Sequence, residues 1–225
     1  MLKSVKRLQN GESFCVICLG DSITEQNFHT HGKLNYVGQL TEWFMYAFGR
    51  RSIFINTGSS GKSSWDIKRS IGEQCARFKP GLATLMIGVN DALKGRSLLD
   101  EFTANLEAIH ETLEENKCEL IMLTPNRINV SLDSPEVVQR RDLPYYVETM
   151  RKISLARGIK LCDINLEWEN LSKLYPWQHW TMMNDPLHPN ERGHDFMAAI
   201  IKKYISEQNN IGKVWDTNTG LVFWE

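Results

Sequence analysis

The sequence predicts an α/β protein in which a parallel sheet is covered by helices on both faces. Short, nearly continuous apolar segments recur along its 225 residues, as in strands that are buried on both sides. Segments with apolar residues at helical spacing lie between them. Because parallel strands need a crossover connection, and the crossover helix covers the sheet, this alternation favours a parallel sheet between two layers of helices.

Five apolar segments account for the expected strands. In chain order they are FCVICL (14–19), SIFIN (52–56), LATLMIG (82–88), ELIMLTP (119–125) and IKLCDI (159–164). The first contains a C-x-x-C pattern, which metal sites and redox pairs also contain. Positions three apart on a strand face opposite sides of the sheet, so we interpret Cys15 and Cys18 as core residues.

Apolar stripes mark the first three expected helices. They lie at residues 37–47, 67–78 and 99–113, where apolar side chains repeat every three or four positions. Ser97, three residues before Asp100, is typical of an N-cap and predicts where the third of these helices begins.

Two more helices are expected in the second half of the chain. One should open at Ser134 and Pro135 and bend or restart at Pro144, because proline suits a first turn but interrupts a helix interior. The last should run from about Asn190 to Gln208.

No linker or repeat divides the sequence, so one domain is expected over residues 1–225, with residues 209–225 as a tail or hairpin. The residues around 217–220 would form the turn of that hairpin. The two tryptophans of the tail would pack on the domain or in a homo-oligomer contact, and the sequence fixes no subunit number.

Composition excludes several classes of protein. Hydrophobic residues make up 42% and charged residues 24%, as in soluble globular proteins. The net charge of −1 gives no field that would attract nucleic acid or a membrane, and no apolar segment approaches the ~20 residues of a membrane span. Five scattered cysteines and the absence of a signal-peptide pattern favour a cytoplasmic location with reduced thiols.

Polar residues follow several of the expected strands. The first strand ends in Gly20-Asp21-Ser22, the second enters the loop NTGSSGKSSWD (56–66), and the third ends in IGVND, with Asn90 at its tip. The stretch NDPLHPNERGHD (184–195) comes after the fifth strand. Ligands of parallel α/β sheets collect beyond the carboxyl ends of the strands, so these segments define a candidate site.

Each segment also has a structural interpretation. Asp and Ser are favoured turn residues, and Asn90 with Asp91 could cap a helix. The segment from Asp185 to His188 could be a rigid loop before the last helix. Together they supply a nucleophile, a base with an acid beside it, and an amide donor, which favours catalysis.

Neither a metal ion nor a cofactor is expected. Asp185, His188 and His194 could form a metal site, but the two histidines lack the i, i+4 spacing that aligns ligands on a helix. The remaining histidines have no evident partners and are expected to be surface or packing residues; they are His29, His31, His110 and His179.

Four motifs in order resemble the blocks of the SGNH, or GDSL-type, hydrolase family. They are G-D-S-I-T at 20–24, the glycine loop at 56–61, G-x-N-D at 88–91 and D-x-x-H at 185–188, within a resemblance that covers about residues 14–205. The resemblance implies a flavodoxin-like, three-layer α/β/α sandwich around a parallel sheet of about five strands.

The resemblance also implies roles for individual residues. Ser22 would be the nucleophile, and Asp185 with His188 would complete a catalytic triad. The backbone N–H groups of Ser22 and Gly61 and the side-chain amide of Asn90 would form the oxyanion hole. Gly58 competes with Gly61, which is preferred because it directly precedes a polar residue and a helix start.

The stretches LMIGVNDAL and LTPNRIN resemble the carbohydrate acetylesterase branch, notably acetylxylan esterases. A serine esterase acting on small acyl esters, chiefly acetyl esters of an oligosaccharide, is therefore expected. The alternatives are a lysophospholipase or thioesterase acting on longer acyl chains and, in another class, a non-catalytic saccharide-binding module. Asp21, Trp177 and Trp180 are the candidate substrate-binding residues, since tryptophan faces stack on sugar rings or grip acyl groups.

Overall fold

The computed structural model describes residues 1–25, 29–129 and 132–211. It contains one five-stranded parallel sheet with the strand order β2-β1-β3-β4-β5. The strands are β1 (Phe14–Gly20), β2 (Ser52–Asn56), β3 (Leu82–Met86), β4 (Glu119–Leu123) and β5 (Lys160–Cys162). All five strands predicted from the apolar segments are therefore confirmed, in a parallel arrangement.

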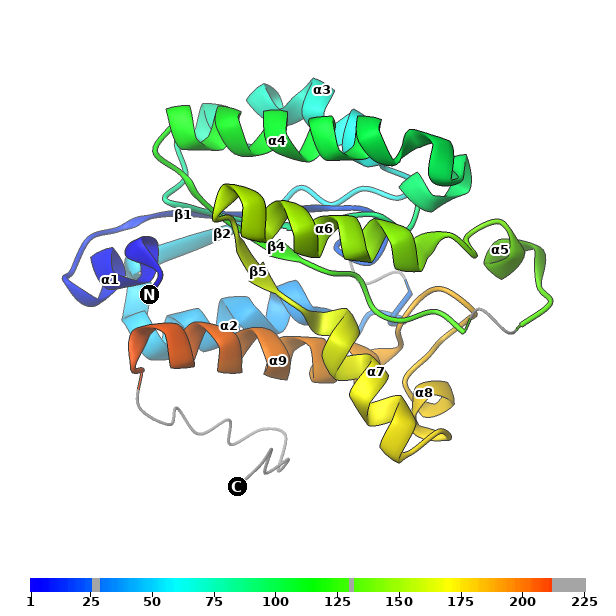
Figure 1. Ribbon diagram of the computed structural model, residues 1–225. Coiled ribbons are helices and arrows are strands. Elements are labelled where there is room, and N and C mark those ends of the chain that lie inside the picture. Colours follow the sequence, from blue (N-terminus) through cyan, green and yellow to red (C-terminus); the bar gives the residue numbers. More distant parts are fainter. Residues whose placement is uncertain (26–28, 130–131, 212–225) are drawn as a thin grey trace.

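Helices cover both faces of this sheet, which makes the predicted three-layer sandwich (Figure 1). One face carries α3 (Ser64–Gln74), α4 (Leu99–Glu115) and α6 (Leu143–Arg157). The other carries α2 (Tyr36–Phe48) and α9 (Glu191–Asn209), with the short α1 (Lys3–Gln9) against α9. The helices α7 (Ile164–Leu174) and α8 (Gln178–Thr181) follow β5.

The predicted stripes are the faces that these helices bury. In α4 the buried apolar side chains are Phe102, Leu106, Ile109 and Leu113, each 2% exposed or less. Burial of such side chains stabilises the fold by roughly 1.5–3 kcal/mol each relative to full exposure. The 3.6-residue period of the sequence thus translates directly into one side of a helix packed on the sheet.

Of two helix boundaries predicted from the sequence, one is wrong and one is confirmed. The predicted Ser97 cap is wrong, because residues 96–98 form a 3-10 turn, η4 (Arg96–Leu98), and α4 begins after Leu98 without a side-chain cap. The predicted restart near Pro144 is confirmed: α5 (Pro135–Val138) ends early, and Pro144 lies in the first turn of α6. A proline there removes only an N–H group that would have no partner in the helix.

The five cysteines form no disulfide within the described chain. Cys18 is buried and Cys15 is half-buried on β1. Among the described residues, no helix is both long and apolar enough to cross a lipid bilayer. The hairpin expected around residues 217–220 lies outside the described residues.

The register of the sheet aligns the carboxyl ends of its central strands. Gly20 at the end of β1 pairs with Met86 at the end of β3, and Met86 pairs with Leu123 at the end of β4. The segments that follow these strands therefore emerge at one edge, on the same side as the loop between α8 and α9 (Figure 1).

Candidate active site

A tight turn after β1 presents Ser22. The carbonyl oxygen of Asp21 accepts hydrogen bonds from the N–H groups of Thr24 and Glu25, at 3.1 and 2.9 Å. The Asp21 carboxylate accepts a further one from the N–H of Ile23, at 3.0 Å. These bonds hold the turn without using the Ser22 hydroxyl, which lies at the tip of the strand.

The loop before α9 carries Asp185 and His188, and its backbone is fixed by several hydrogen bonds. The N–H groups of Leu187 and His188 both donate to Asp185 Oδ1, each at 2.8 Å. Asn126, which follows β4, donates from Nδ2 to the carbonyl oxygen of Leu187 at 3.1 Å. Asn126 was not singled out from the sequence, because nothing in the LTPN segment shows that it reaches this loop.

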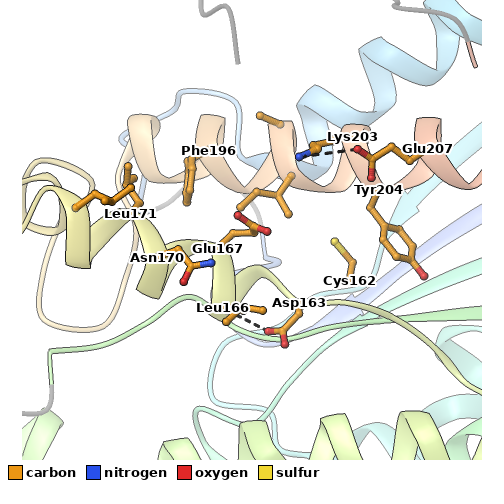
Figure 2. A pocket seen from close by; sticks show the side chains of 13 residues that line it. Cys162, Asp163, Leu166, Glu167, Asn170, Leu171, Phe196, Lys203, Tyr204 and Glu207 are labelled. Atoms are coloured by element: carbon orange, nitrogen blue, oxygen red, sulfur yellow. Dashed lines mark hydrogen bonds and ion pairs between the residues drawn. The ribbon is translucent and has the colours of Figure 1, made fainter. Parts of the chain in front are cut away.

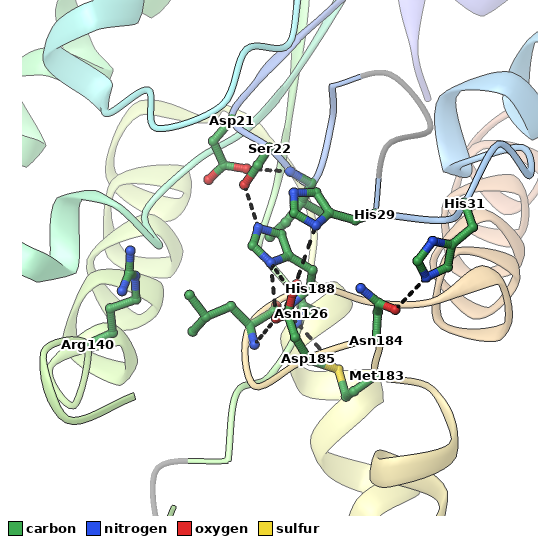
Figure 3. A network of polar contacts seen from close by, with 12 residues as sticks. Asp21, Ser22, His29, His31, Asn126, Arg140, Met183, Asn184, Asp185 and His188 are labelled. Atoms are coloured by element: carbon green, nitrogen blue, oxygen red, sulfur yellow. Dashed lines mark hydrogen bonds and ion pairs between the residues drawn. The ribbon is translucent and has the colours of Figure 1, made fainter. Parts of the chain in front are cut away.

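Ser22, His188 and Asp185 form one hydrogen-bonded chain (Figure 3). The distance from Ser22 Oγ to His188 Nε2 is 2.8 Å, and His188 Nδ1 lies 2.8 and 3.0 Å from the two Asp185 oxygens. The two partners of His188 lie 166 and three positions away in the sequence. The structure thus brings together the three residues that the sequence predicted as a triad.

The ionised state of Asp185 determines where the protons lie in the hydrogen bonds that join Ser22, His188 and Asp185. Partial burial would raise its pKa, but the hydrogen bonds from the His188 ring and from the backbone N–H groups outweigh burial and lower the pKa to about 2. An ionised Asp185 accepts the proton of His188 Nδ1, which leaves Nε2 as the acceptor for the Ser22 hydroxyl. This is the tautomer that a general base needs.

Asn90 follows β3 and is oriented by two neighbours. Its Nδ2 donates to the carbonyl oxygen of Lys62 at 3.0 Å, and its Oδ1 accepts from Arg140 Nη2 at 3.4 Å. Arg140 lies between α5 and α6 and was not predicted, because its position depends on how that connection folds over the site. Asp91 agrees with the structural interpretation of this segment as a helix cap. Its carboxylate accepts hydrogen bonds from the N–H and the hydroxyl of Ser64 at the start of α3.

The two candidate glycines of the 56–61 loop differ in their surroundings. Gly58 donates its N–H to Asn56 Oδ1 at 2.9 Å, and a Cβ at Gly58 would come within 2.6 Å of the Glu25 nitrogen. Gly61 is exposed, has φ of +78°, and precedes Lys62, whose carbonyl binds Asn90. Since the Gly58 N–H is already used within the protein, the geometry favours Gly61 as an oxyanion donor.

Asp21 lies beneath the site instead of facing it. Only 1% of the residue is exposed, and its Oδ2 makes no hydrogen bond within the described part of the chain. Burial raises its pKa to about 7, against the smaller opposing effects of the Ile23 N–H and of His188. A substrate that approaches Ser22 from solvent therefore meets the serine and not the Asp21 carboxyl.

The predicted tryptophans lie on the exposed segment around α8. Trp177 is 60% and Trp180 is 49% exposed. Trp180 lines a cavity of about 270 Å³ with Arg127, which directly follows the Asn126 that holds the His188 loop. Both side chains are thus accessible to a ligand, and the Trp180 ring also makes an edge contact with His179, with centroids 5.4 Å apart.

A cavity of about 470 Å³ borders the other side of the site. It reaches the candidate site through His29, whose ring stacks on that of His188 with centroids 3.6 Å apart. Its lining residues are all polar: His29, Thr30, His31, Lys33, Thr181, Asn190, Glu191 and Arg192.

Several histidines expected to lack partners have them. His29 contacts His188, and His31 Nε2 lies 3.1 Å from Asn184 Oδ1. His179 Nδ1 accepts the indole N–H of Trp168 at 3.1 Å. No sequence signal distinguishes His29 from a surface histidine, because its contact depends on a chain reversal between β1 and α2.

His194 is not part of the site. It is buried in α9, where its Nδ1 accepts the N–H of Tyr36 at 3.3 Å, and burial lowers its pKa to about 3. His29, Asp185 and His188 instead place one possible metal-ligand atom each within 4.8 Å of one another. The two rings are parallel within 3°, so one ion cannot lie in both ring planes unless a ring turns.

Comparisons with known proteins agree with this fold. The chain is 25% identical over 218 residues to an acetylxylan esterase of Geobacillus stearothermophilus, covering 88% of this chain and 96% of that protein. The crystal structure of Axe2, an acetylxylan esterase from the same organism, has a TM-score of 0.70 at 24% identity, covering 87% of this chain and 95% of that one. LAE5, an alpha/beta hydrolase enzyme from the metagenome of Lake Arreo, has a TM-score of 0.68 at 23% identity, covering 85% and 94%.

The match to a family model is the most direct of these findings. The model of the GDSL-like lipase/acylhydrolase family matches residues 18–196. That range begins within β1 and ends in α9, so it includes Ser22, Asn90 and the loop from Asp185 to His188. The chain therefore belongs to the GDSL-like lipase/acylhydrolase family and is a carboxylic ester hydrolase.

Proposed function

We propose that this chain is a serine esterase that removes acetyl groups from short saccharides, with Ser22 as its nucleophile. The observation that carries the proposal is the hydrogen-bonded chain from Ser22 through His188 to Asp185. A hydroxyl, an imidazole and a carboxylate in this order form the arrangement that activates a serine for acyl transfer.

Acylation begins when Ser22 Oγ attacks the carbonyl carbon of the ester. His188 Nε2 takes the hydroxyl proton, and the ionised Asp185 stabilises the resulting imidazolium. When the tetrahedral intermediate collapses, the bond to the alcohol oxygen breaks and that oxygen receives the proton from His188. The acetyl group remains on Ser22.

The oxyanion needs hydrogen-bond donors that are in place before the reaction. The N–H groups of Ser22 and Gly61 and the Nδ2 of Asn90 are the candidate donors. Nδ2 carries two hydrogens, of which one binds the Lys62 carbonyl and fixes the amide plane. The second hydrogen is then available to the oxyanion, and donors fixed in this way need no reorganisation.

Deacylation repeats the same proton transfers with water. His188 removes a proton from a water molecule, which attacks the acyl carbon, and the proton then passes to Ser22 Oγ as acetate leaves. The turn after β1 and the hydrogen-bonded loop before α9 hold the two reacting side chains in place through both half-reactions.

Two observations support a small acyl group on a polar alcohol. The acetylxylan esterase matched above covers nearly the full length of this chain. The residues that line the cavity next to His29 carry hydroxyl, imidazole, amide and charged groups, which can form hydrogen bonds with sugar hydroxyls. Trp180 lines the cavity of about 270 Å³, and we assign it to stack on a sugar ring. We assign Trp177 to extend this aromatic surface.

Labelling with a fluorophosphonate, followed by peptide mapping, tests the nucleophile. The label is expected on Ser22 in the wild type and in Ser60→Ala, an exposed hydroxyl of the 56–61 loop, and it is expected to be absent from Ser22→Ala. A label on another residue would refute the assignment. Rates with p-nitrophenyl acetate and octanoate test the acyl group, and a preference for octanoate would instead indicate the lysophospholipase or thioesterase activity.

A cytoplasmic location, the independence from metal ions and cofactors, and the absence of nucleic-acid and membrane partners remain predictions from the sequence. The same is true of a homo-oligomeric state.

A further inference from the structure

A second imidazole lies flat against His188 (Figure 3). The ring centroids of His29 and His188 are 3.6 Å apart, and their planes are parallel within 3°. His29 Nδ1 also lies 3.9 Å from Asp185 Oδ2, the same oxygen that is 2.8 Å from His188 Nδ1. His29 thus contacts both the residue that would take the Ser22 proton and the carboxylate that would stabilise the resulting imidazolium, although it lies on a different segment from both.

The known hydrogen bonds of His188 leave one motion unrestrained. Asp185 and Ser22 bind the two ring nitrogens, so they fix the ring at its edges. Rotation about the axis through these two contacts would tilt the faces of the ring while keeping both N···O distances, so the two hydrogen bonds alone do not fix the plane of the ring. A flat group at van der Waals distance from one face prevents this tilt, and His29 occupies that position.

The charges around His29 fit a neutral ring. Burial lowers its pKa, and the nearby His188 and His31 lower it further, while Asp185 and Glu25 oppose the change. Lys33, Glu191 and Arg192 line the cavity on its other side. A neutral aromatic face next to His188 also suits the imidazolium that forms during the reaction, whereas a second cation there would oppose it.

We propose that His29 is a positioning residue, which holds the His188 ring in the plane that joins Asp185 to Ser22. The inference rests on the proposed role of His188 as general base. His29 takes no part in the proton transfer. Its positioning role requires a flat ring at this distance from His188 and does not require a ring nitrogen.

Three variants separate these contributions. His29→Ala removes the ring, and His29→Phe keeps a flat ring without a titratable nitrogen. His110→Ala is the matched control, because it also removes an imidazole, but from α4, on a segment that contributes nothing to the site. Each is assayed for kcat and KM on p-nitrophenyl acetate and for thermal unfolding.

The expected result is a loss of kcat in His29→Ala of about ten- to a hundredfold at nearly unchanged KM, because misplacement of a reacting group slows the reaction without weakening substrate binding. His29→Phe should recover kcat to within about threefold of the wild type, and His110→Ala should retain the wild-type kcat. If His29 had a purely structural role, His29→Ala would lower the unfolding temperature and would not lower kcat selectively at an unchanged KM. Wild-type kcat in His29→Ala, or a loss in His29→Phe as large as in His29→Ala, would overturn the inference.

The rate of fluorophosphonate labelling at Ser22 separates this inference from the proposed function. If Ser22 is labelled in the wild type and His188→Ala is inactive, the proposed mechanism stands whatever the His29 variants do. If Ser22 is not labelled, the proposed function fails first. Slower labelling of Ser22 in His29→Ala than in His29→Phe supports the positioning role directly.

Discussion

The candidate active site and the groove between α7 and α9 are two regions of very different character. The groove is a cavity of about 450 Å³ beside β5, and its lining includes Leu166, Leu171 and Phe196 (Figure 2). Some of its polar groups pair with one another or with the backbone: Lys203 lies 3.8 Å from Glu207, and Asp163 accepts the N–H of Leu166 at 3.1 Å. The groove has room for a ligand but no aligned reactive groups.

The candidate active site has the opposite character. Its side chains come from the ends of β1 and β3 and from the loop before α9, and hydrogen bonds join Ser22 to His188, which would take its proton, and His188 to the Asp185 carboxylate. The comparison teaches that the arrangement of polar groups, and not the volume of a cavity, locates the chemistry in this fold. Substitutions in the two regions should therefore have very different effects.

Loss of the nucleophile should give the largest effect. Ser22→Ala is expected to lower kcat on p-nitrophenyl acetate on the order of 10⁵- to 10⁶-fold, because no other hydroxyl is aligned with His188 Nε2 in the described site. Steady-state kinetics with purified protein measure this change. Residual activity of Ser22→Ala within tenfold of the wild type would show that Ser22 is not the nucleophile.

Removal of the Asp185 charge should be the next largest effect. Asp185→Asn is expected to lower kcat on the order of 10⁴-fold, because an amide can stabilise the wrong tautomer of His188 and cannot balance its charge. The pKa of Asp185 is lowered to about 2, so the wild-type carboxylate is ionised at every pH of an ordinary assay. The same substitution at Asp142, which pairs with the exposed Arg96, is the matched control and should leave kcat nearly unchanged.

Asn90 should contribute less than the triad. Asn90→Ala is expected to lower kcat about a hundred- to a thousandfold with a small change in KM, because its amide would bind the oxyanion more strongly than the ground-state carbonyl. A rise in KM at constant kcat would show instead that Asn90 binds the substrate in its ground state.

Asp21 should affect stability more than chemistry, through its buried carboxyl. Its pKa is raised from 3.8 to about 7, so between these values the folded protein keeps a proton that the unfolded chain releases. Its contribution to the free energy of unfolding is therefore full below about pH 4 and is lost as the pH rises through about 7, a difference on the order of a few kcal/mol.

Thermal unfolding of the wild type and of Asp21→Asn at pH 4, 6 and 8 measures this contribution. The wild type should lose stability relative to the variant as the pH rises, and the difference should level off above pH 7. A constant difference between the two proteins across this range would show that Asp21 does not keep its proton in the folded state.

A substitution in the groove should have the smallest effect. Leu166→Ser changes a partly exposed side chain between α7 and α9, so kcat/KM is expected to stay within about twofold and the unfolding free energy within roughly 0.5 kcal/mol. A large loss of activity in this variant would contradict the conclusion that the groove takes no part in the reaction.

Much of the fold was predictable because it depends on local periodicity. The apolar segments gave five strands, and the stripe from residue 99 to residue 113 gave α4, since burial of one face follows directly from the spacing of apolar side chains. The Ser97 cap was predicted wrongly because a 3-10 turn at η4 replaced it, and turn geometry there depends on the neighbouring η3 (Asp91–Lys94) as well as on local residue type.

The candidate site divides in the same way. Ser22, Asn90, Asp185 and His188 could be predicted, because each follows a strand or precedes a helix in a recognisable motif. Arg140, Asn126 and the stacking of His29 on His188 could not, since each lies in an irregular connection whose path is set by packing. The burial of Asp21 was equally hidden, because its neighbours in the sequence do not show which side of the strand end is covered.

The sequence by itself determined the order of strands and helices and the types of reactive side chain that follow the strands. Only the tertiary structure decided which of these side chains meet, at what distance and with which protons. The physical reason is range: apolar periodicity acts over a few residues, whereas the 2.8 Å contact between Ser22 and His188 joins positions 166 apart and exists only after the sheet and its connections have packed.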